Sequence, residues 1–291
     1  MNTRPLGPAG PEVSAVGLGG MPLSIDGRPD PDTAVRVIHA ALDEGVTLID
    51  TADVYCLDDD DLGHNERLVA RALREWPAGR NSILVATKGG MRRPGGGWTR
   101  DARPERLKEA CDASLQALGV ECIDLYQLHA PDPRVPLADS VGALAELRDE
   151  GKIRRIGLSN VTVAEIRQAE EVADIATVQN RLSLFFREAI DEGVVSYTSG
   201  REIALLAYSP VGGGRLNRKL PDHPVVGRIA EKYEASPHAV ALAWVLALAP
   251  NIFVIPGARS VEHATDSAHV PGLTLFDEDL VILDEAEFST A

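Results

Sequence analysis

Short runs of apolar residues recur along the chain and alternate with longer segments whose apolar positions follow helical spacing. The runs have the length of β-strands and are rich in Val, Ile and Leu. They are Val16–Leu18, Val46–Asp50, Ile83–Lys88, Ile123–His129, Ile153–Ser159, Ile175–Gln179, Ile203–Tyr208 and Ile252–Ile255. This alternation of strand and helix predicts a parallel sheet with crossover helices.

The segments between the runs carry helix signals. Residues 31–44 place Ala34, Val37, Ile38, Ala41 and Leu42 on one helical face. Thr162 with Glu165 has the spacing of a capping box, and Ser236 is suited to cap the helix after it. The remaining expected helices lie at Asn65–Arg74, Pro104–Leu118, Leu137–Glu150, Glu188–Ser196, Val225–Ala235, Pro237–Leu248, Val261–Ala268 and Glu278–Ala286.

Eight strand–helix units in one chain of 291 residues predict an α/β fold, a (β/α)8 TIM barrel, as a single domain over residues 1–291. Residues 1–15 are expected to form an N-terminal β-hairpin with its turn at Gly7–Pro11, and extra helices are expected near the C-terminus. The competing fold is a doubly wound sheet. Its phosphate-binding GxGxxG motif is missing, because the nearest match, Gly17–Pro22, ends in proline.

Composition narrows the class of function. The formal net charge of −15 argues against nucleic acid as a partner, whereas a few local arginines could still bind a small anion. Three cysteines (Cys56, Cys111 and Cys122) form no CxxC pair, which is typical of a reducing cytoplasm. We expect no secretory signal and no membrane span. The acidic run Asp58–Asp61 is expected to be a solvated loop.

Polar residues stand where six successive strands end. In a (β/α)8 barrel these ends meet at one face, where function collects. Each residue alone has a plain structural explanation, such as a capping or turn-forming role, but the series predicts a site. Its members are Asp50, Lys88, His129, Ser159 with Asn160, Gln179, and Tyr208 with Ser209.

The first three strand ends, with Tyr55 from the following loop, have a common chemistry. A phenol has a pKa of about 10, and we expect the Lys88 ammonium to lower it while Asp50 keeps Lys88 charged. His129 could donate a second hydrogen bond to the oxygen that Tyr55 protonates. The set lacks a nucleophile and has no metal-binding motif. Hydride from a nicotinamide would complete a carbonyl reduction.

The motifs that contain these residues resemble those of the aldo-keto reductases. The resemblance runs in order over nearly the whole chain and implies the (β/α)8 barrel, NADPH as cofactor and a small carbonyl compound as substrate. It aligns Asp50, Tyr55, Lys88 and His129 with the catalytic tetrad, Tyr55 being the general acid. The matching segments are D-T-A-D-V-Y, A-T-K, L-Y-Q-L-H, G-K-I-R-R-I-G-L-S-N, V-Q-N, A-Y-S-P-V-G-G-G and V-I-P-G-A-R-S.

The same resemblance implies a cofactor-binding set. Ser159, Asn160 and Gln179 would hold the carboxamide, Tyr208 would stack on the nicotinamide ring, and Arg259 would grip the 2′-phosphate together with Ser260. The complete expected set is Gly20, Met21, Asp50, Ser159, Asn160, Gln179, Tyr208, Ser209, Pro210, Val211, Gly212, Ile255, Gly257, Arg259, His263, Asp266 and Ser267.

Two features depart from the family pattern. Asp266 and Ser267 stand where the family commonly has Glu-Asn at the adenine. The long C-terminal loop that shapes many substrate pockets is missing, so we expect a pocket that is open or closed by other loops.

Two other functions remain open at this stage. Lys88 could form a Schiff base in an aldolase-like reaction, although Asp50 would hold it protonated. Alternatively, the chain could be a nicotinamide-binding regulatory subunit with little turnover. The sequence leaves the substrate and the oligomeric state undetermined.

Overall fold

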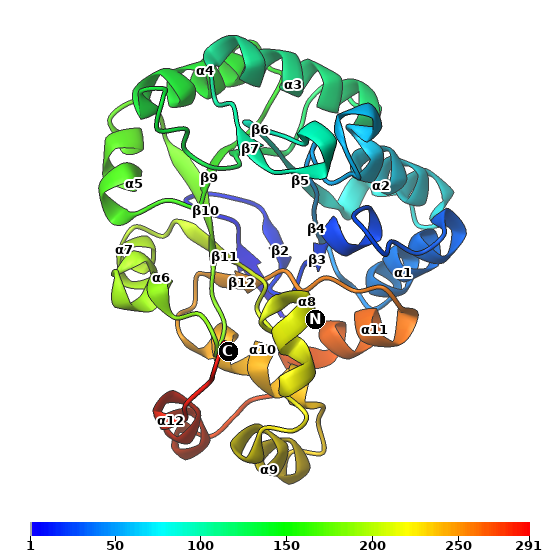
Figure 1. Cartoon of the computed structure of the whole chain (residues 1–291), viewed down its shortest axis with the longest axis vertical. Helices are drawn as coiled ribbons and strands as arrows, with labels where there is room; N and C mark the ends of the chain where they lie inside the picture. Colours follow the sequence, from blue (N-terminus) through cyan, green and yellow to red (C-terminus); the bar gives the residue numbers. More distant parts are fainter. Residues whose placement is uncertain (1) are drawn as a thin grey trace.

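The computed structural model describes residues 2–291, and within them eight parallel strands form one sheet (Figure 1). Parallel bridges from Val16 to Val254 and from Gly19 to Gly257 join its two outer strands and close it into a barrel. The predicted (β/α)8 barrel is confirmed. In sheet order the strands are β12 (Ile252–Val254), β11 (Ala204–Tyr208), β10 (Ile175–Arg181), β9 (Ile156–Ser159), β8 (Leu125–Leu128), β5 (Leu84–Gly89), β4 (Leu48–Asp50) and β3 (Leu18–Gly19).

Helices surround the barrel in chain order (Figure 1). The α-helices are α1 (Pro31–Asp43), α2 (His64–Glu75), α3 (Pro104–Leu118), α4 (Leu137–Asp149), α5 (Val163–Glu170), α6 (Glu188–Asp191), α7 (Val194–Gly200), α8 (Gly213–Leu216), α9 (Pro224–Lys232), α10 (Pro237–Ala247), α11 (Val261–His269) and α12 (Asp277–Glu285). Short 3-10 turns are η1 (Met21–Leu23), η2 (Asp59–Asp61), η3 (Arg80–Ser82), η4 (Pro94–Gly96), η5 (Asn217–Lys219) and η6 (Val270–Gly272). No helix within residues 2–291 is long and apolar enough to cross a membrane.

Local sequence signals set the ends of several helices. The predicted capping box is present, since the Thr162 hydroxyl accepts from the Glu165 amide and Glu165 bonds back to the Thr162 amide. Ser236 caps α10 by accepting from the amide of Ala239. Helix α3 begins at Pro104 and stops at Gly119, whose φ of 65° is left-handed and therefore suits glycine.

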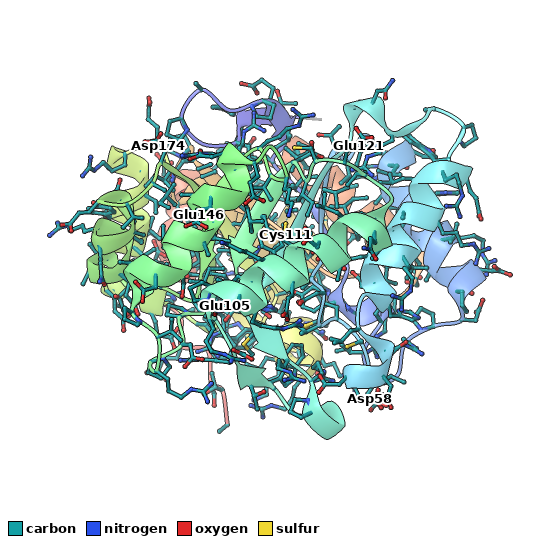
Figure 2. All side chains as sticks on the ribbon, turned by 90° about the horizontal axis from the view of Figure 1, so that it is seen from above. Asp58, Glu105, Cys111, Glu121, Glu146 and Asp174 are labelled. Carbon is teal, nitrogen blue, oxygen red and sulfur yellow. The ribbon has the colours of Figure 1, made fainter. Side chains whose placement is uncertain are left out.

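The hydrophobic core has two layers. The hairpin β1 (Thr3–Pro5) and β2 (Glu12–Ser14) contributes Leu6 and Val13 to a cluster inside the barrel. This cluster also contains Leu48, Leu84, Ala86, Leu125, Ala204, Leu206, Phe253 and Ile255. The hairpin plugs one end of the barrel, and Figure 2 shows Asp58 at the opposite end.

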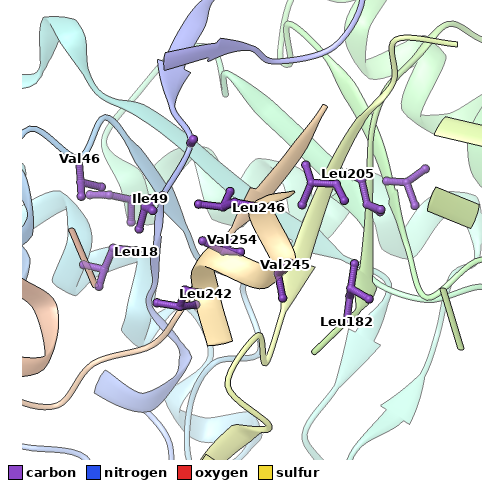
Figure 3. Packing of buried hydrophobic residues seen from close by; sticks show 14 of the residues in the cluster. Leu18, Val46, Ile49, Leu182, Leu205, Leu242, Val245, Leu246 and Val254 are labelled. Carbon is purple, nitrogen blue, oxygen red and sulfur yellow. The ribbon is translucent and has the colours of Figure 1, made fainter. Parts of the chain in front are cut away.

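The second layer lies between the strands and the helices. Figure 3 shows Leu242, Val245 and Leu246 of α10 beside Val254 of β12. Each of these side chains is at most 9% exposed. Helix α10 is apolar on nearly all sides, which suits a helix that is covered by neighbouring elements.

Three expected segments differ in detail from the structure. The expected helix 188–196 is two helices, α6 and α7, because Gly193 breaks the run with a φ of 79°. The connection between the expected strand Ile83–Lys88 and the expected helix Pro104–Leu118 contains a small antiparallel hairpin, β6 (Met91–Arg92) with β7 (Thr99–Arg100), for which no strand was expected. Gly213 and Gly214 are the first residues of the short helix α8, for which no helix was expected.

Candidate active site

The barrel brings three predicted strand-end residues and Tyr55 to one face. Asp50 is the last residue of β4, Lys88 is near the end of β5, and His129 directly follows β8. The Lys88 amine lies 2.7 and 2.8 Å from the two Asp50 carboxylate oxygens and 2.9 Å from the Tyr55 hydroxyl. The Tyr55 and His129 rings meet edge to face with their centroids 5.8 Å apart. Parallel strands point their carboxyl ends the same way, which explains this convergence.

The Lys88 side chain is completely buried, and its amine is surrounded by hydrogen-bond partners. Besides Asp50 and Tyr55, its amine donates to the carbonyl of Thr51 at 2.9 Å. Burial lowers the pKa of Lys88, and the neighbouring Asp50 carboxylate opposes that shift. A buried ion pair is tolerated when further hydrogen bonds satisfy it.

The Asp50 carboxylate has those further bonds. Gln179 donates to its Oδ1 atom at 2.7 Å and Gln127 at 3.4 Å. Gln127 was not among the predicted site residues. Gln127 lies two positions before His129 in L-Y-Q-L-H. A glutamine within an apolar strand is the signal from which its place in the site could have been predicted.

The pKa of Tyr55 differs from the expectation that Lys88 would lower it. Burial, followed by the Asp50 carboxylate, raises the pKa of Tyr55 well above 10. The pairing of Asp50 with Lys88 leaves little net positive field at the phenol, so the cost of burying a phenolate prevails. Tyr55 therefore keeps its proton at neutral pH.

His129 is neutral at neutral pH. Burial, together with the charge of Lys88, lowers the pKa of His129 well below 6.5. Its Nδ1 atom has no hydrogen-bond partner within residues 2–291. A neutral imidazole offers one N–H donor and one acceptor, so His129 can bind a carbonyl oxygen without adding charge.

A cavity of about 540 Å³ opens beside these groups, a size typical of a small-molecule site. Fifteen of its lining residues were predicted from the sequence: Met21, Asp50, Tyr55, His129, Ser159, Asn160, Gln179, Tyr208, Ser209, Pro210, Val211, Ile255, Gly257, Arg259 and His263. The others are Gly19, Pro22, Ile25, Trp98, Gly213, Gly214, Asn217 and Arg218.

The side chains expected to bind the carboxamide form hydrogen bonds with one another and with neighbouring residues. The Asn160 amide donates to the carbonyl of His129 at 2.9 Å, and the Tyr208 hydroxyl donates to Asn160 Oδ1 at 2.7 Å. The Ser159 hydroxyl donates to the carbonyl of Gln179 at 2.8 Å. Asn160 has a φ of 60°, a left-handed conformation that asparagine tolerates and that turns the chain sharply after β9.

Some expected cofactor residues lie outside the cavity lining. Gly20 packs against Asn65, and a Cβ at Gly212 would lie 2.7 Å from the Phe185 ring. Asp266 accepts a hydrogen bond from the α10 cap Ser236, 2.7 Å away. Ser267 lines a separate small cavity of about 10 Å³. Asn217 and Arg218 line the main cavity although neither was predicted, because they follow the glycine run without a motif of their own.

Comparison with known proteins shows the family of this chain. The model of the aldo/keto reductase family matches residues 15–287. The chain belongs to the aldo/keto reductase family. A probable aldo-keto reductase from Glycine max is 34% identical, with 97% of this chain and 87% of that protein covered. An aldo-keto reductase of Strobilurus tenacellus is 32% identical over 92% of this chain and 87% of its own length.

Two solved structures place this aldo/keto reductase among enzymes of the same fold. The glycerol dehydrogenase of Gluconobacter oxydans has a TM-score of 0.84 at 33% identity, covering 97% of this chain and 94% of that one. The Klebsiella pneumoniae aldo/keto reductase, solved with NADP and acetate, has a TM-score of 0.82 at 28% identity, covering 98% and 95%. The sequence-based family assignment and the prediction of an oxidoreductase are confirmed.

Proposed function

We propose that this aldo/keto reductase reduces an aldehyde or ketone to the alcohol, with NADPH as cofactor and Tyr55 as general acid. The observation that carries the proposal is the 2.9 Å contact between the Tyr55 hydroxyl and the buried Lys88 amine at the edge of the cavity. Nicotinamide supplies the hydride when it is bound. We place the reaction in the reducing cytoplasm, because the three cysteines are free.

The residues around Tyr55 suit it to donate a proton. Since Lys88 donates to the phenol oxygen, the phenol's own hydrogen is free to point to the cavity. The raised pKa keeps that hydrogen in place until charge develops on a carbonyl oxygen. After proton transfer, the Lys88 ammonium stabilises the phenolate, while His129 donates the second hydrogen bond.

The donors along the cavity fit a dinucleotide. The lining includes the hydroxyl and amide groups of Ser159, Asn160 and Gln179, which suit a carboxamide. It also includes Arg259, Arg218 and His263, which suit phosphate. We propose Tyr208 for the nicotinamide face and residues 209–212 for the pyrophosphate, with Arg259 favouring NADPH over NADH. Met21, Ile255 and Gly257 would shape other parts of the cofactor site. Asp266, Ser267 and Gly20 remain predictions.

The aldolase alternative has little support. A Schiff base needs an amine that can reach its substrate, whereas Lys88 is fully buried, does not line the cavity and donates to three neighbours.

The deciding experiment is a panel of carbonyl compounds assayed with NADPH and NADH in parallel. Turnover of aldehydes or ketones with a preference for NADPH is the expected result. Tight NADPH binding without turnover across the panel would instead favour the regulatory subunit. Reduction of a substrate adduct on Lys88 by borohydride would restore the aldolase.

A further inference from the structure

A row of polar residues crosses the interior of the barrel beside Lys88. The sheet register pairs Lys88 of β5 with Gln127 of β8. It pairs Gly157 of β9 with Gln127 on one side and with Thr177 of β10 on the other. Leu125, on the same face of β8 as Gln127, belongs to the cluster inside the barrel. Bulky branched residues usually fill this space, so buried polar side chains here need hydrogen-bond partners of their own.

The Gln127 side chain bridges Asp50 and Thr177. Its amide nitrogen donates to Asp50 Oδ1 and its amide oxygen accepts from the Thr177 hydroxyl, both at 3.4 Å. The chemistry of these neighbours fixes which way the amide points. An ionised carboxylate only accepts hydrogen bonds, so the nitrogen must face Asp50, whereas a hydroxyl can donate to the oxygen. The Thr177 hydroxyl therefore aligns the Gln127 nitrogen toward Asp50.

Gly157 leaves the space in which Gln127 and Thr177 meet. Strand β9 lies between the strands that carry these two residues, so a side chain at the matching position would separate them. A Cβ at Gly157 would lie 2.3 Å from the Thr177 hydroxyl oxygen and 2.7 Å from Gln127 Cγ, closer than atoms in contact can come. The glycine is therefore required by the contact between its two neighbours.

Gln127 differs from Gln179, the other amide on Asp50, in its access to the cavity. Gln179 donates to Asp50 Oδ1 at 2.7 Å and also lines the cavity, so its side chain can contact a bound molecule. Gln127 is completely buried and lies outside the cavity lining. Its contact with Asp50 is therefore independent of what the cavity holds.

We propose that Gln127 is a positioning residue that holds the Asp50 carboxylate for proton donation by Tyr55. Thr177 and the gap at Gly157 align it. This inference rests on the proposed reductase function. Gln127 acts through Asp50, because an amide that donates to a carboxylate shares part of its charge. After burial, the Asp50 charge is the next cause that raises the pKa of Tyr55. Sharing that charge makes the phenolate left after proton transfer less costly.

The main test compares the wild type with Gln127→Met, which keeps the length of the side chain but removes its amide. We expect kcat for reduction of propanal to fall about three- to tenfold, the usual contribution of one hydrogen bond, with the Kd for NADPH unchanged. The pH at which alcohol oxidation reaches half its maximum should rise by about half to one unit, which is the same factor expressed as a change in pKa. A merely structural role would lower Tm without moving this pH.

Thr177 offers a conservative pair of variants. Thr177→Val removes the hydroxyl that aligns the amide and should lower kcat in the same direction by a smaller factor, whereas Thr177→Ser keeps the hydroxyl and should stay near wild type. The double variant Gln127→Met/Thr177→Val should be no slower than Gln127→Met alone, because both act through one contact. A slower double variant would contradict the alignment by Thr177.

Tyr126→Phe is the matched control. It also removes a buried hydrogen bond of 3.4 Å from β8, in this case to the carbonyl of Leu107. Tyr126 is next to Gln127 and therefore lies on the opposite face of the strand, where it packs in the layer between strands and helices. This variant should leave kcat and the pH of half-maximal oxidation unchanged.

A measurement without turnover separates this inference from the reductase proposal. A fluorinated tyrosine in place of Tyr55, whose phenol is more acidic than that of tyrosine, is titrated by 19F NMR in the NADPH-free protein. We expect its midpoint to be about half to one unit higher in Gln127→Met than in the wild-type background. The other titratable groups beside this phenol are the same in both backgrounds: Asp50, Asp53, Lys88, His129 and Tyr208.

The midpoint decides the outcome. An unchanged midpoint in Gln127→Met, or an equal rise in Tyr126→Phe, would overturn the inference whatever happens to kcat. If Gln127→Met does not fold, the midpoint in Thr177→Val decides in its place. A raised midpoint in a protein that reduces no carbonyl compound would refute the reductase and leave the role of Gln127 toward Asp50 intact.

Discussion

At the scale of single residues, the site depends on how burial changes the protonation of ordinary side chains. Tyr55 is 6% exposed and Asp50 is 2% exposed, so charge on either is costly unless it is paired. Lys88 pairs with Asp50 and touches Tyr55, which leaves a protonated phenol beside a cation. His129 stays neutral for the same reason.

The first prediction concerns the proton donor. We expect Tyr55→Phe to reduce kcat by about 10²–10⁴, the usual contribution of a general acid, with NADPH affinity close to wild type. Steady-state kinetics and cofactor titration measure the two effects. Activity above about a tenth of wild type would exclude Tyr55 as the essential acid.

The second prediction concerns pH. Because the pKa of Tyr55 lies well above 10 and that of His129 well below 6.5, neither group changes protonation between pH 7 and 9. The kcat for carbonyl reduction should therefore be flat over this range and fall only when the phenol loses its proton. Alcohol oxidation needs the phenolate, so its rate should rise with pH. A bell-shaped reduction profile centred near neutrality would contradict this assignment.

At the scale of elements, the turns and helix caps that follow the strands hold the polar residues at the strand ends in position. Strand β9 ends at Ser159, and the chain then passes through Asn160 and enters α5 at the Thr162 capping box within a few residues. The cap satisfies amides that would otherwise lack partners at the helix start. It also limits how far the chain carrying Ser159 and Asn160 can move.

Removing the cap should cost stability. We expect Thr162→Ala to lower the free energy of unfolding by about 1 kcal/mol, which corresponds to about 2 °C in Tm for a chain of this size. Thr162→Ser keeps the oxygen acceptor and should stay near wild type. Thermal unfolding followed by circular dichroism measures both; equal Tm values for the Ala and Ser variants would show that the capping bond contributes nothing.

At the scale of the whole molecule, residues far apart in sequence meet beside the segment that contributes Asn217 and Arg218 to the cavity. The Phe288 ring stacks on His223 with centroids 4.3 Å apart and meets Phe185 edge to face at 5.5 Å. Lys219 donates to the carbonyl of Ser289 at 3.2 Å. Residues 287–291 therefore lie on the segment that contributes Asn217 and Arg218 to the cavity, and they do not line the cavity themselves.

Removing the contacts of the Phe288 ring with His223 and Phe185 should weaken cofactor binding. We expect Phe288→Ala to raise the Kd for NADPH roughly fivefold, a typical coupling between neighbouring segments, with little change in kcat at saturating cofactor. Fluorescence titration measures the Kd. Phe276→Ala removes another partly exposed phenylalanine and controls for lost apolar surface; the same Kd change in both variants would refute the coupling.

The sequence by itself determined the barrel, its strand order along the chain, most helix ends and the placement of Asp50, Lys88 and His129 where strands end. These follow from local causes: apolar periodicity, Pro104 and Gly119 at the ends of α3, and polar residues closing apolar runs. Each signal can be read within a few neighbouring positions.

Only the tertiary structure decided how those residues behave and what surrounds them. The raised pKa of Tyr55, the bonds of Gln127 and Gln179 to Asp50, and the stacking of Trp98 on Arg93 all depend on burial and on contacts between distant segments. Electrostatic energy depends on distance and on exclusion of water, and neither quantity can be read from the order of residues along a chain.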